Sequence, residues 1–163
     1  MKKALIALLL LHATSFAAND LANIQLNDLA GQPQALSQWQ GRPLVINYWA
    51  TWCGPCRQEI PDLIELQKKY QGKVQLIGIA IDDAAAVNAF IRPLNVNYPI
   101  LIGGNSAMEM MRRQGNLHAG LPFTVIFDAR GQKIAVQLGR IKKEQLDRVL
   151  SSFSQPASIS KVY

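Results

Sequence analysis

Residues 44–56 have the sequence LVINYWATWCGPC, in which a short apolar segment leads directly into two cysteines separated by two residues. The segment 44–49 is rich in β-branched and aromatic residues and contains one polar residue, Asn47. This is the pattern of a strand that is covered on both faces. After Cys53, apolar residues recur at roughly helical spacing as far as Tyr70. The stretch therefore predicts a buried strand that ends at the cysteine pair and a helix that begins there.

The strand-then-helix pattern occurs a second time downstream. Residues 74–81 predict another buried strand, and residues 84–94 carry apolar side chains at the spacing of one helix face. Residues 124–128 and 133–138 flank a turn that contains Gly131, which predicts a β-hairpin. Shorter elements are expected at 24–29 (strand), 99–102 (strand), 106–114 (helix) and around 146–153 (helix). Together these elements predict an α/β fold with a mixed central sheet and helices on both faces.

The position of the cysteines at the start of a helix suggests their chemistry. The first turn of a helix has N–H groups without partners and a partial positive charge, so it stabilises a thiolate, the attacking form of cysteine. Cys53 is expected at that end. Cys56, one turn further on, lies on the same face and is expected to be less exposed. Pro55 suits an early helical position because its missing N–H would have had no partner there. We therefore expect Cys53 to attack and Cys56 to resolve.

A cysteine pair at this spacing has two other possible roles. A zinc site needs two further ligands, and after residue 17 the chain offers only His118 and carboxylates, with no second pair of cysteines. A purely structural disulfide between Cys53 and Cys56 would close a very small loop, which constrains the unfolded chain little. A redox-active pair is therefore favoured, and neither a metal nor a cofactor is expected.

The N-terminus has the organisation of a secretory leader. Lys2 and Lys3 precede the apolar run 4–11, and small residues then lead to an expected cleavage after Ala17. The apolar run is shorter than the roughly 20 residues that span a bilayer. We therefore expect residues 1–17 to be a cleaved signal peptide and the mature protein to be soluble and periplasmic or otherwise extracytoplasmic. An uncleaved membrane anchor is the alternative.

The charge pattern argues against a nucleic-acid partner. The chain has 17 Lys and Arg against 11 Asp and Glu, a formal net charge of +6. Removal of the two leader lysines lowers it to +4, because all 11 acidic residues lie after the leader. The remaining basic residues are scattered, without a run of five and without interleaved aromatic residues.

Residues 49–56 (WATWCGPC), followed far downstream by residues 120–124 (GLPFT), resemble the thioredoxin superfamily. The subgroup that they resemble is the exported TlpA/ResA-like thiol-disulfide oxidoreductases, which are similar to the thioredoxins of cytochrome c maturation. Asn47 and an additional strand-helix unit at about 74–98 favour this subgroup. The resemblance covers about residues 36–153. It implies one thioredoxin-like domain within residues 18–163, with a C-terminal tail beyond residue 155.

The resemblance also implies which residues contact a client protein. Pro122 matches the cis-proline of the family, and the backbone of Leu121 is expected to pair with an extended client segment. Gly139 matches a glycine that allows the client backbone to approach, or it serves only as the turn at the end of a strand. The residues expected to bind substrate are Trp52, Gly54, Pro55, Leu121, Pro122 and Gly139.

Cys56 must also lose and regain a proton during the cycle, and Asn47 has no acidic group that could exchange it. The resemblance suggests that Asp83 takes this part, whereas the alternative is that Asp83 caps the helix that begins after it. Arg57 and Glu59 lie on the helix after the cysteines and are expected to be solvated.

The implied activity is the reduction of client disulfides. The thiolate of Cys53 attacks a client disulfide and Cys56 resolves the mixed disulfide. The implied clients are apocytochrome c, its maturation chaperones or copper-site assembly proteins, and a membrane thiol-electron donor is expected to recharge the enzyme. The Gly-Pro pair between the cysteines is typical of reductants. The alternatives are a disulfide-forming oxidant, a copper-binding assembly module and a peroxidase of the peroxiredoxin type.

Overall fold

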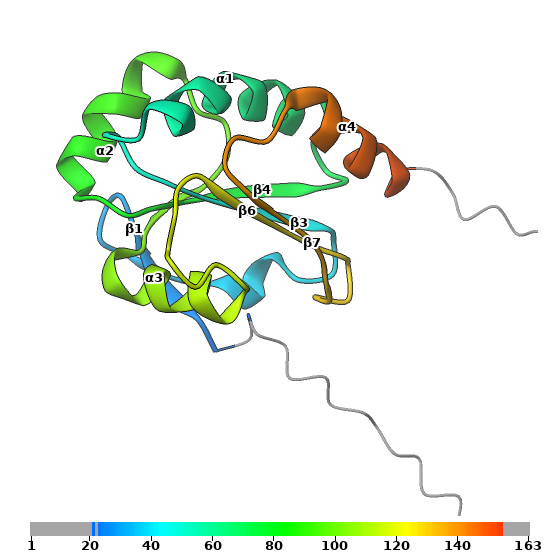
Figure 1. Ribbon diagram of the computed structural model, residues 1–163, viewed down its shortest axis with the longest axis horizontal. Helices are drawn as coiled ribbons and strands as arrows, with labels where there is room; N and C mark the ends of the chain where they lie inside the picture. The colour runs from blue at the N-terminus through cyan, green and yellow to red at the C-terminus, as the bar shows by residue number, and fades with distance from the viewer. Residues whose placement is uncertain (1–20, 22, 155–163) are drawn as a thin grey trace, which may run out of the picture.

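A computed structural model describes residue 21 and residues 23–154 of the protein. The signal peptide, its cleavage after Ala17 and the tail beyond residue 155 lie outside these residues and stay predictions. In the described part, one sheet forms the middle layer, with α1, α2 and α4 on one face and α3 on the other (Figure 1). The α/β fold with helices on both faces of the sheet is confirmed.

The sheet of the described residues has seven strands in the order β2-β1-β5-β4-β3-β6-β7. β3, β4 and β5 are parallel, and the other neighbouring pairs are antiparallel, so the sheet is mixed as predicted. The strands are β1 (Gln25–Asp28), β2 (Pro33–Ala35), β3 (Leu44–Trp49), β4 (Gln75–Ala80), β5 (Ile100–Ile102), β6 (Phe123–Phe127) and β7 (Lys133–Leu138). The α-helices are α1 (Gly54–Lys69), α2 (Ala84–Ile91), α3 (Gly104–Arg113) and α4 (Lys143–Ser152).

The central strand β3 divides the core into two halves. All six of its residues are buried, and successive side chains of a strand point to opposite faces. Val45 and Trp49 join the core under α1, α2 and α4, whereas Ile46 and Tyr48 join the core under α3. By the same alternation, Asn47 faces α1. Asn47, the one polar residue of β3, therefore lies beneath α1, the helix that carries the cysteines.

Two segments differ from the sequence prediction. β2 and the 3-10 turn after it, Leu36–Trp39, were not predicted, because a three-residue strand that begins with a proline has almost no local signal. The helix expected over residues 84–94 ends at Ile91 and continues as the 3-10 turn Arg92–Leu94. Pro93 explains this ending, since it has no N–H to donate to an α-helical bond.

Among residues 21 and 23–154, no helix is both long enough and apolar enough to cross a bilayer.

Candidate active site

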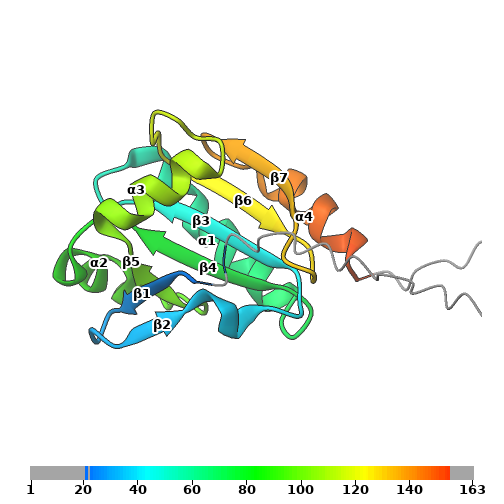
Figure 2. The same ribbon diagram turned by 90° about the horizontal axis from the view of Figure 1, so that it is seen from below.

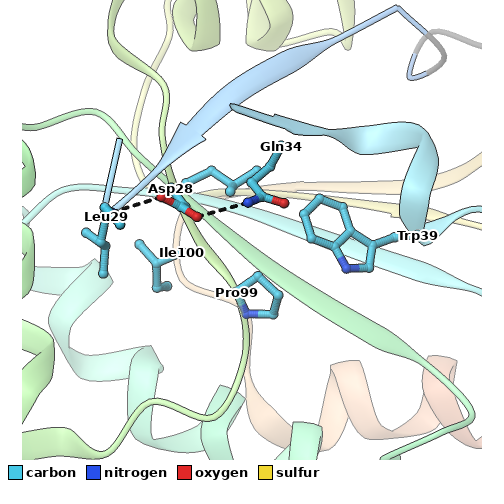
Figure 3. A pocket seen from close by; sticks show the side chains of 8 residues that line it. Asp28, Leu29, Gln34, Trp39, Pro99 and Ile100 are labelled. Atoms are coloured by element: carbon cyan, nitrogen blue, oxygen red, sulfur yellow. Dashed lines mark hydrogen bonds between the residues drawn. The ribbon is translucent and has the colours of Figure 1, made fainter. Parts of the chain in front are cut away.

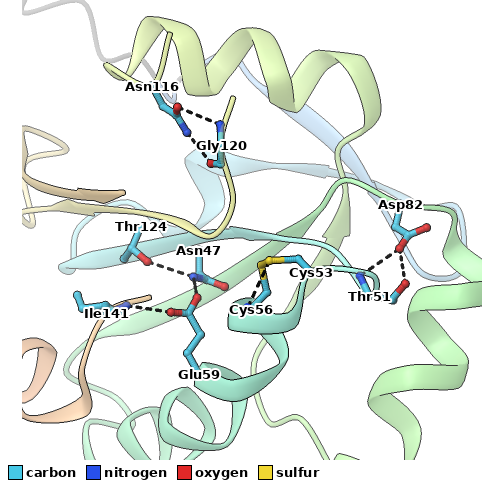
Figure 4. The surroundings of a disulfide bond; sticks show 10 residues. All are labelled: Asn47, Thr51, Cys53, Cys56, Glu59, Asp82, Asn116, Gly120, Thr124 and Ile141. Atoms are coloured by element: carbon cyan, nitrogen blue, oxygen red, sulfur yellow. Dashed lines mark hydrogen bonds between the residues drawn. A yellow bond between two sulfur atoms is a disulfide. The ribbon is translucent and has the colours of Figure 1, made fainter. Parts of the chain in front are cut away.

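A disulfide joins Cys53 and Cys56 at the N-terminus of α1, at an S–S distance of 2.04 Å (Figure 4). Cys53 is the N-cap residue of the helix, and its Sγ accepts the N–H of Cys56 at 3.3 Å. Cys56 is completely buried, whereas Cys53 is 6% exposed. The structure therefore confirms the placement of the pair at a helix start and the difference in their exposure.

The loop before Cys53 is tied to the end of β4. Both the N–H and the hydroxyl of Thr51 donate hydrogen bonds to Oδ2 of Asp82, at 3.1 Å and 2.5 Å. Although burial raises the pKa of Asp82, these hydrogen bonds and one from the Asp83 N–H hold that pKa below its usual value. A charged carboxylate thus fixes the loop that presents Trp52, whose surface is 70% exposed.

A second loop lies at the same end of the sheet. Tyr48 of β3 is paired with Phe123 of β6, so the segment before Phe123 is close to the segment after β3. The Leu121–Pro122 peptide bond is cis, as the resemblance implied. The carbonyl of Pro122 accepts the N–H of Gly139 at 2.8 Å, and Gly139 has a φ of +79°, which favours glycine. The Leu121–Pro122 pair is therefore brought together with Gly139, which is distant from it in the sequence.

The position of Glu59 differs from the sequence prediction. It was expected to be solvated, but it is completely buried. Its Oε1 accepts a hydrogen bond of 2.7 Å from the Asn47 side chain, and its Oε2 accepts the N–H of Ile141 at 3.0 Å. The same Asn47 amide donates to Thr124 at 3.1 Å (Figure 4). Arg57, by contrast, is exposed as expected.

Burial changes the acidity of Glu59. Loss of solvation raises its pKa to about 7, against the opposing effects of the hydrogen bonds from Asn47 and Ile141 and of the Arg140 charge. Glu59 therefore exchanges a proton near neutral pH. Residues three apart on a helix lie on the same face, so Glu59 follows Cys56 on the buried face of α1. The arrangement puts an acid-base group next to the inner cysteine.

The sequence did contain a signal for this burial. The apolar face of α1 includes Ile60, Leu63 and Leu66. Glu59 adjoins Ile60 and lies one turn after Cys56, so it is a charged residue on an otherwise apolar stripe. Such residues are seldom buried without partners, and here the partners come from β3 and from the segment before α4.

Asp83 has the capping role that was one of its two interpretations. It is the N-cap of α2, its Oδ1 accepts the N–H of Ala86 at 2.8 Å, and the residue is exposed. The structure therefore confirms the capping of α2. A redox role for Asp83 stays a prediction.

Among the described residues, no group of three or more His, Cys, Asp or Glu side chains is arranged to hold a metal ion. Met110 and Met111 are buried in the core under α3, as expected from their spacing. His118 is exposed in the loop after that helix.

A pocket also lies at the opposite part of the sheet, between β1, β2 and β5 (Figure 3). Asp28, on its wall, accepts the Gln34 amide at 2.9 Å and the N–H groups of Ala30 and Gln32, each at 2.9 Å. The carboxylate therefore organises the turn between β1 and β2.

Comparison with known proteins agrees with this geometry. A sequence profile of the AhpC/TSA family matches residues 17–135, which is more than half of the chain. The chain belongs to the AhpC/TSA family. Within this family it is similar to the thiol-disulfide oxidoreductase ResA of Bacillus thuringiensis, with 31% identity over 134 residues, 81% of this chain and 75% of ResA.

Solved structures give the same fold for this AhpC/TSA-family chain. The thioredoxin-related protein of Neisseria meningitidis is 30% identical, with a TM-score of 0.70 over 79% of this chain and 98% of that protein. A secreted disulfide oxidoreductase of Mycobacterium tuberculosis is 23% identical and has a TM-score of 0.69 over 83% of this chain and 99% of that protein. The AhpC/TSA-family chain is therefore a thiol-disulfide oxidoreductase of the ResA type with a thioredoxin-like fold.

Proposed function

We propose that the protein is an exported reductant of client-protein disulfides. The observation that carries the proposal is the contrast between the two cysteines: Cys53 is the N-cap of α1 and is 6% exposed, whereas Cys56 is completely buried. The thiolate of Cys53 attacks one sulfur of the client disulfide. A bond forms between the client and Cys53, and the other client sulfur leaves as a thiolate that takes up a proton. Cys56 then attacks Sγ of Cys53, which releases the second client thiol and leaves the enzyme disulfide.

The second attack requires that Cys56 lose its proton inside the protein. Glu59 is the acid-base group on the same helix face, and its pKa of about 7 is suited to accept a proton at neutral pH. The amide of Asn47 and the N–H of Ile141 hold its two oxygens. We therefore assign proton transfer at Cys56 to Glu59 rather than to Asp83, whose carboxylate is exposed and caps α2.

The client segment is proposed to lie between Trp52 and the loop that contains Pro122. The exposure of Trp52 and the partial exposure of Leu121 support this groove. At Gly139 and Gly54, the space where a Cβ would stand has no atom within 4 Å, so a client backbone can approach. Pro55, in the first turn of α1, is exposed beside them.

Export and clients follow from the leader pattern and from the relatives. The expected signal peptide at 1–17 and the similarity to a protein described as secreted support an extracytoplasmic location. We propose apocytochrome c, its maturation chaperones or copper-site assembly proteins as clients, and a membrane thiol-electron donor as the source of electrons. The Gly-Pro pair between the cysteines supports the reducing direction. A reduction potential of about −270 mV is expected, and one above about −150 mV would place the protein among the oxidants.

Capture of clients in cells tests the proposal. Cys56→Ser keeps the attacking sulfur and cannot resolve, so it is expected to accumulate mixed disulfides between Cys53 and its clients. Cys53→Ser is the matched control, since it retains only the buried sulfur. Mass spectrometry of the captured proteins distinguishes haem-attachment clients from copper-site proteins. Equal capture by the two variants, or capture by neither, would contradict the assigned order of attack.

A further inference from the structure

The exposed face of β7 carries a row of apolar side chains. Ile134, Val136 and Leu138 are 47%, 50% and 58% exposed, and we call these three residues the β7 stripe. Alternate residues of a strand share one face, so the three side chains stand side by side. Apart from Trp52 and Leu117, they are the only exposed large hydrophobic residues in the part of the chain that the structure describes.

The extent of α3 explains why this row is uncovered. Phe123 and Val125 of β6 are paired with Leu138 and Val136 of β7. The β6 residues on this face are buried in the core under α3, whereas their β7 partners are not. Figure 2 shows α3 over the middle of the sheet and β7 at the sheet edge, beyond the end of the helix.

The β7 stripe begins at the client groove. Leu138 lies within 3.2 Å of the position that a Cβ on Gly120 would take, and the next residue, Gly139, is hydrogen-bonded to Pro122. At the other end of the strand, Lys133 donates a 3.0 Å hydrogen bond to the carbonyl of Gln114. The loop 114–120 therefore borders β7 at both ends, and it contributes Leu117, which is 72% exposed.

The charges around the β7 stripe favour one kind of occupant. Lys133 lies at one end of the strand, whereas Arg140, beyond the other end, is paired with Asp62 at 3.3 Å. A second copy of the chain that paired across β7 would bring a second Lys133 to this edge. A neutral or acidic polypeptide meets no such repulsion.

We infer that the β7 stripe binds an extended apolar segment of the client polypeptide next to the cysteine under attack. The inference rests on the proposed function and specifies its substrate class, which is a polypeptide that has not yet buried its apolar residues. Because a strand rises about 3.3 Å per residue, Leu138 and Ile134 are about 13 Å apart. A client must therefore extend several residues beyond its disulfide to cover the stripe.

Peptide kinetics with matched variants test this inference. The substrates are ten-residue peptides joined through one cysteine to glutathione, with leucine and valine or with serine and threonine on either side of the cysteine. The variant Ile134→Thr/Val136→Thr keeps β-branched side chains on the strand, and Gln132→Thr is an exposed control next to it. Oxidised glutathione is the substrate that is too short to reach the stripe.

The double variant is expected to raise KM for an apolar peptide about tenfold, which is the effect of losing part of the burial of two aliphatic side chains. The kcat, the rates with polar peptides and with oxidised glutathione, and the Gln132→Thr control are expected to stay unchanged. The unchanged glutathione rate also shows that the variant is folded.

Three outcomes would overturn the inference. An active enzyme whose KM for apolar peptides does not respond to the double variant removes the stripe from client binding. A wild-type dimer that the double variant converts to monomers, with KM unchanged, shows that the stripe binds a second copy. If residues after 154 cover the stripe instead, the full chain does not distinguish apolar from polar peptides, and only a chain that ends at 154 binds apolar peptides more tightly. Failure of the wild type to reduce any disulfide would instead contradict the proposed function, and the inference with it.

Discussion

The side chain of Asn47 donates a 2.7 Å hydrogen bond to Oε1 of Glu59, so a strand residue and a helix residue form one buried polar pair beneath the disulfide (Figure 4). Asn47 has no acidic group, and its Oδ1 has no hydrogen-bond partner among the described residues. The ionisable member of the pair is therefore Glu59. Stability and catalysis are both expected to depend on its protonation.

Glu59→Gln is expected to remove part of the pH dependence of stability. The pKa of Glu59 is about 7 in the folded protein and about 4.5 in the unfolded chain. Between these values the folded state binds more protons, so the free energy of unfolding falls as pH rises from 4.5 to 7 and then levels off. The loss is roughly 3 kcal/mol. Urea unfolding at pH 5 and pH 8 measures it, and equal slopes for wild type and variant would refute the buried acid.

The same substitution is expected to change the resolving step of the cycle. If Glu59 accepts the proton of Cys56, the rate at which a bound client is released rises through pH 7 in the wild type. In Glu59→Gln that rise is lost, and release at pH 8 slows on the order of a hundredfold. Single-turnover release of a fluorescent peptide from Cys53 measures the step. An unaltered pH profile would show that proton transfer takes another route.

Two substitutions at Asp83 separate capping from redox chemistry. Asp83→Ala removes the acceptor for the Ala86 N–H and is expected to destabilise the protein by about 1 kcal/mol. Asp83→Asn keeps a capping side chain without a carboxylate, so both stability and disulfide turnover are expected to stay close to wild type. A large loss of turnover in Asp83→Asn with normal stability would show that Asp83, rather than Glu59, accepts the proton of Cys56.

A side chain at Gly78 is expected to crowd the core under α1. A Cβ at this position would lie 2.6 Å from Cδ1 of Ile100 and 3.0 Å from Nε1 of Trp49. Gly78→Ala therefore forces a repacking of the core under α1 and should destabilise the protein by about 1–3 kcal/mol. Gly54→Ala is the comparison, because a Cβ there meets no atom within 4 Å. Equal unfolding midpoints for the two variants would contradict this packing.

Local sequence signals predicted much of the fold and the centre of the site. The run before Cys53 predicted β3, and the cysteine spacing predicted a pair at the start of a helix. The cis bond at Pro122 came from a resemblance, because most bonds before proline are trans. Elements without a strong local pattern were missed, and β2 is the example, since it forms only by pairing with β1.

The role of Glu59 required the three-dimensional arrangement. One of its partners is on β3, and the other, the N–H of Ile141, is 82 residues away in the sequence. No local window joins these residues. The exposure of Val136 is a similar case, because it depends on how far α3 extends over the sheet rather than on the alternating pattern of β7 itself.

The position of Cys53 as the N-cap of α1 has a consequence for the ionic strength at which the enzyme works. Its sulfur accepts the backbone N–H of Cys56 at 3.3 Å, a buried group that is fixed by the helix rather than carried on a mobile cation. Dissolved salt screens buried interactions less than it screens exposed charges. The Cys53 thiolate should therefore keep its reactivity as the salt concentration rises. An enzyme that stabilised its thiolate with an exposed lysine would become slower under the same conditions.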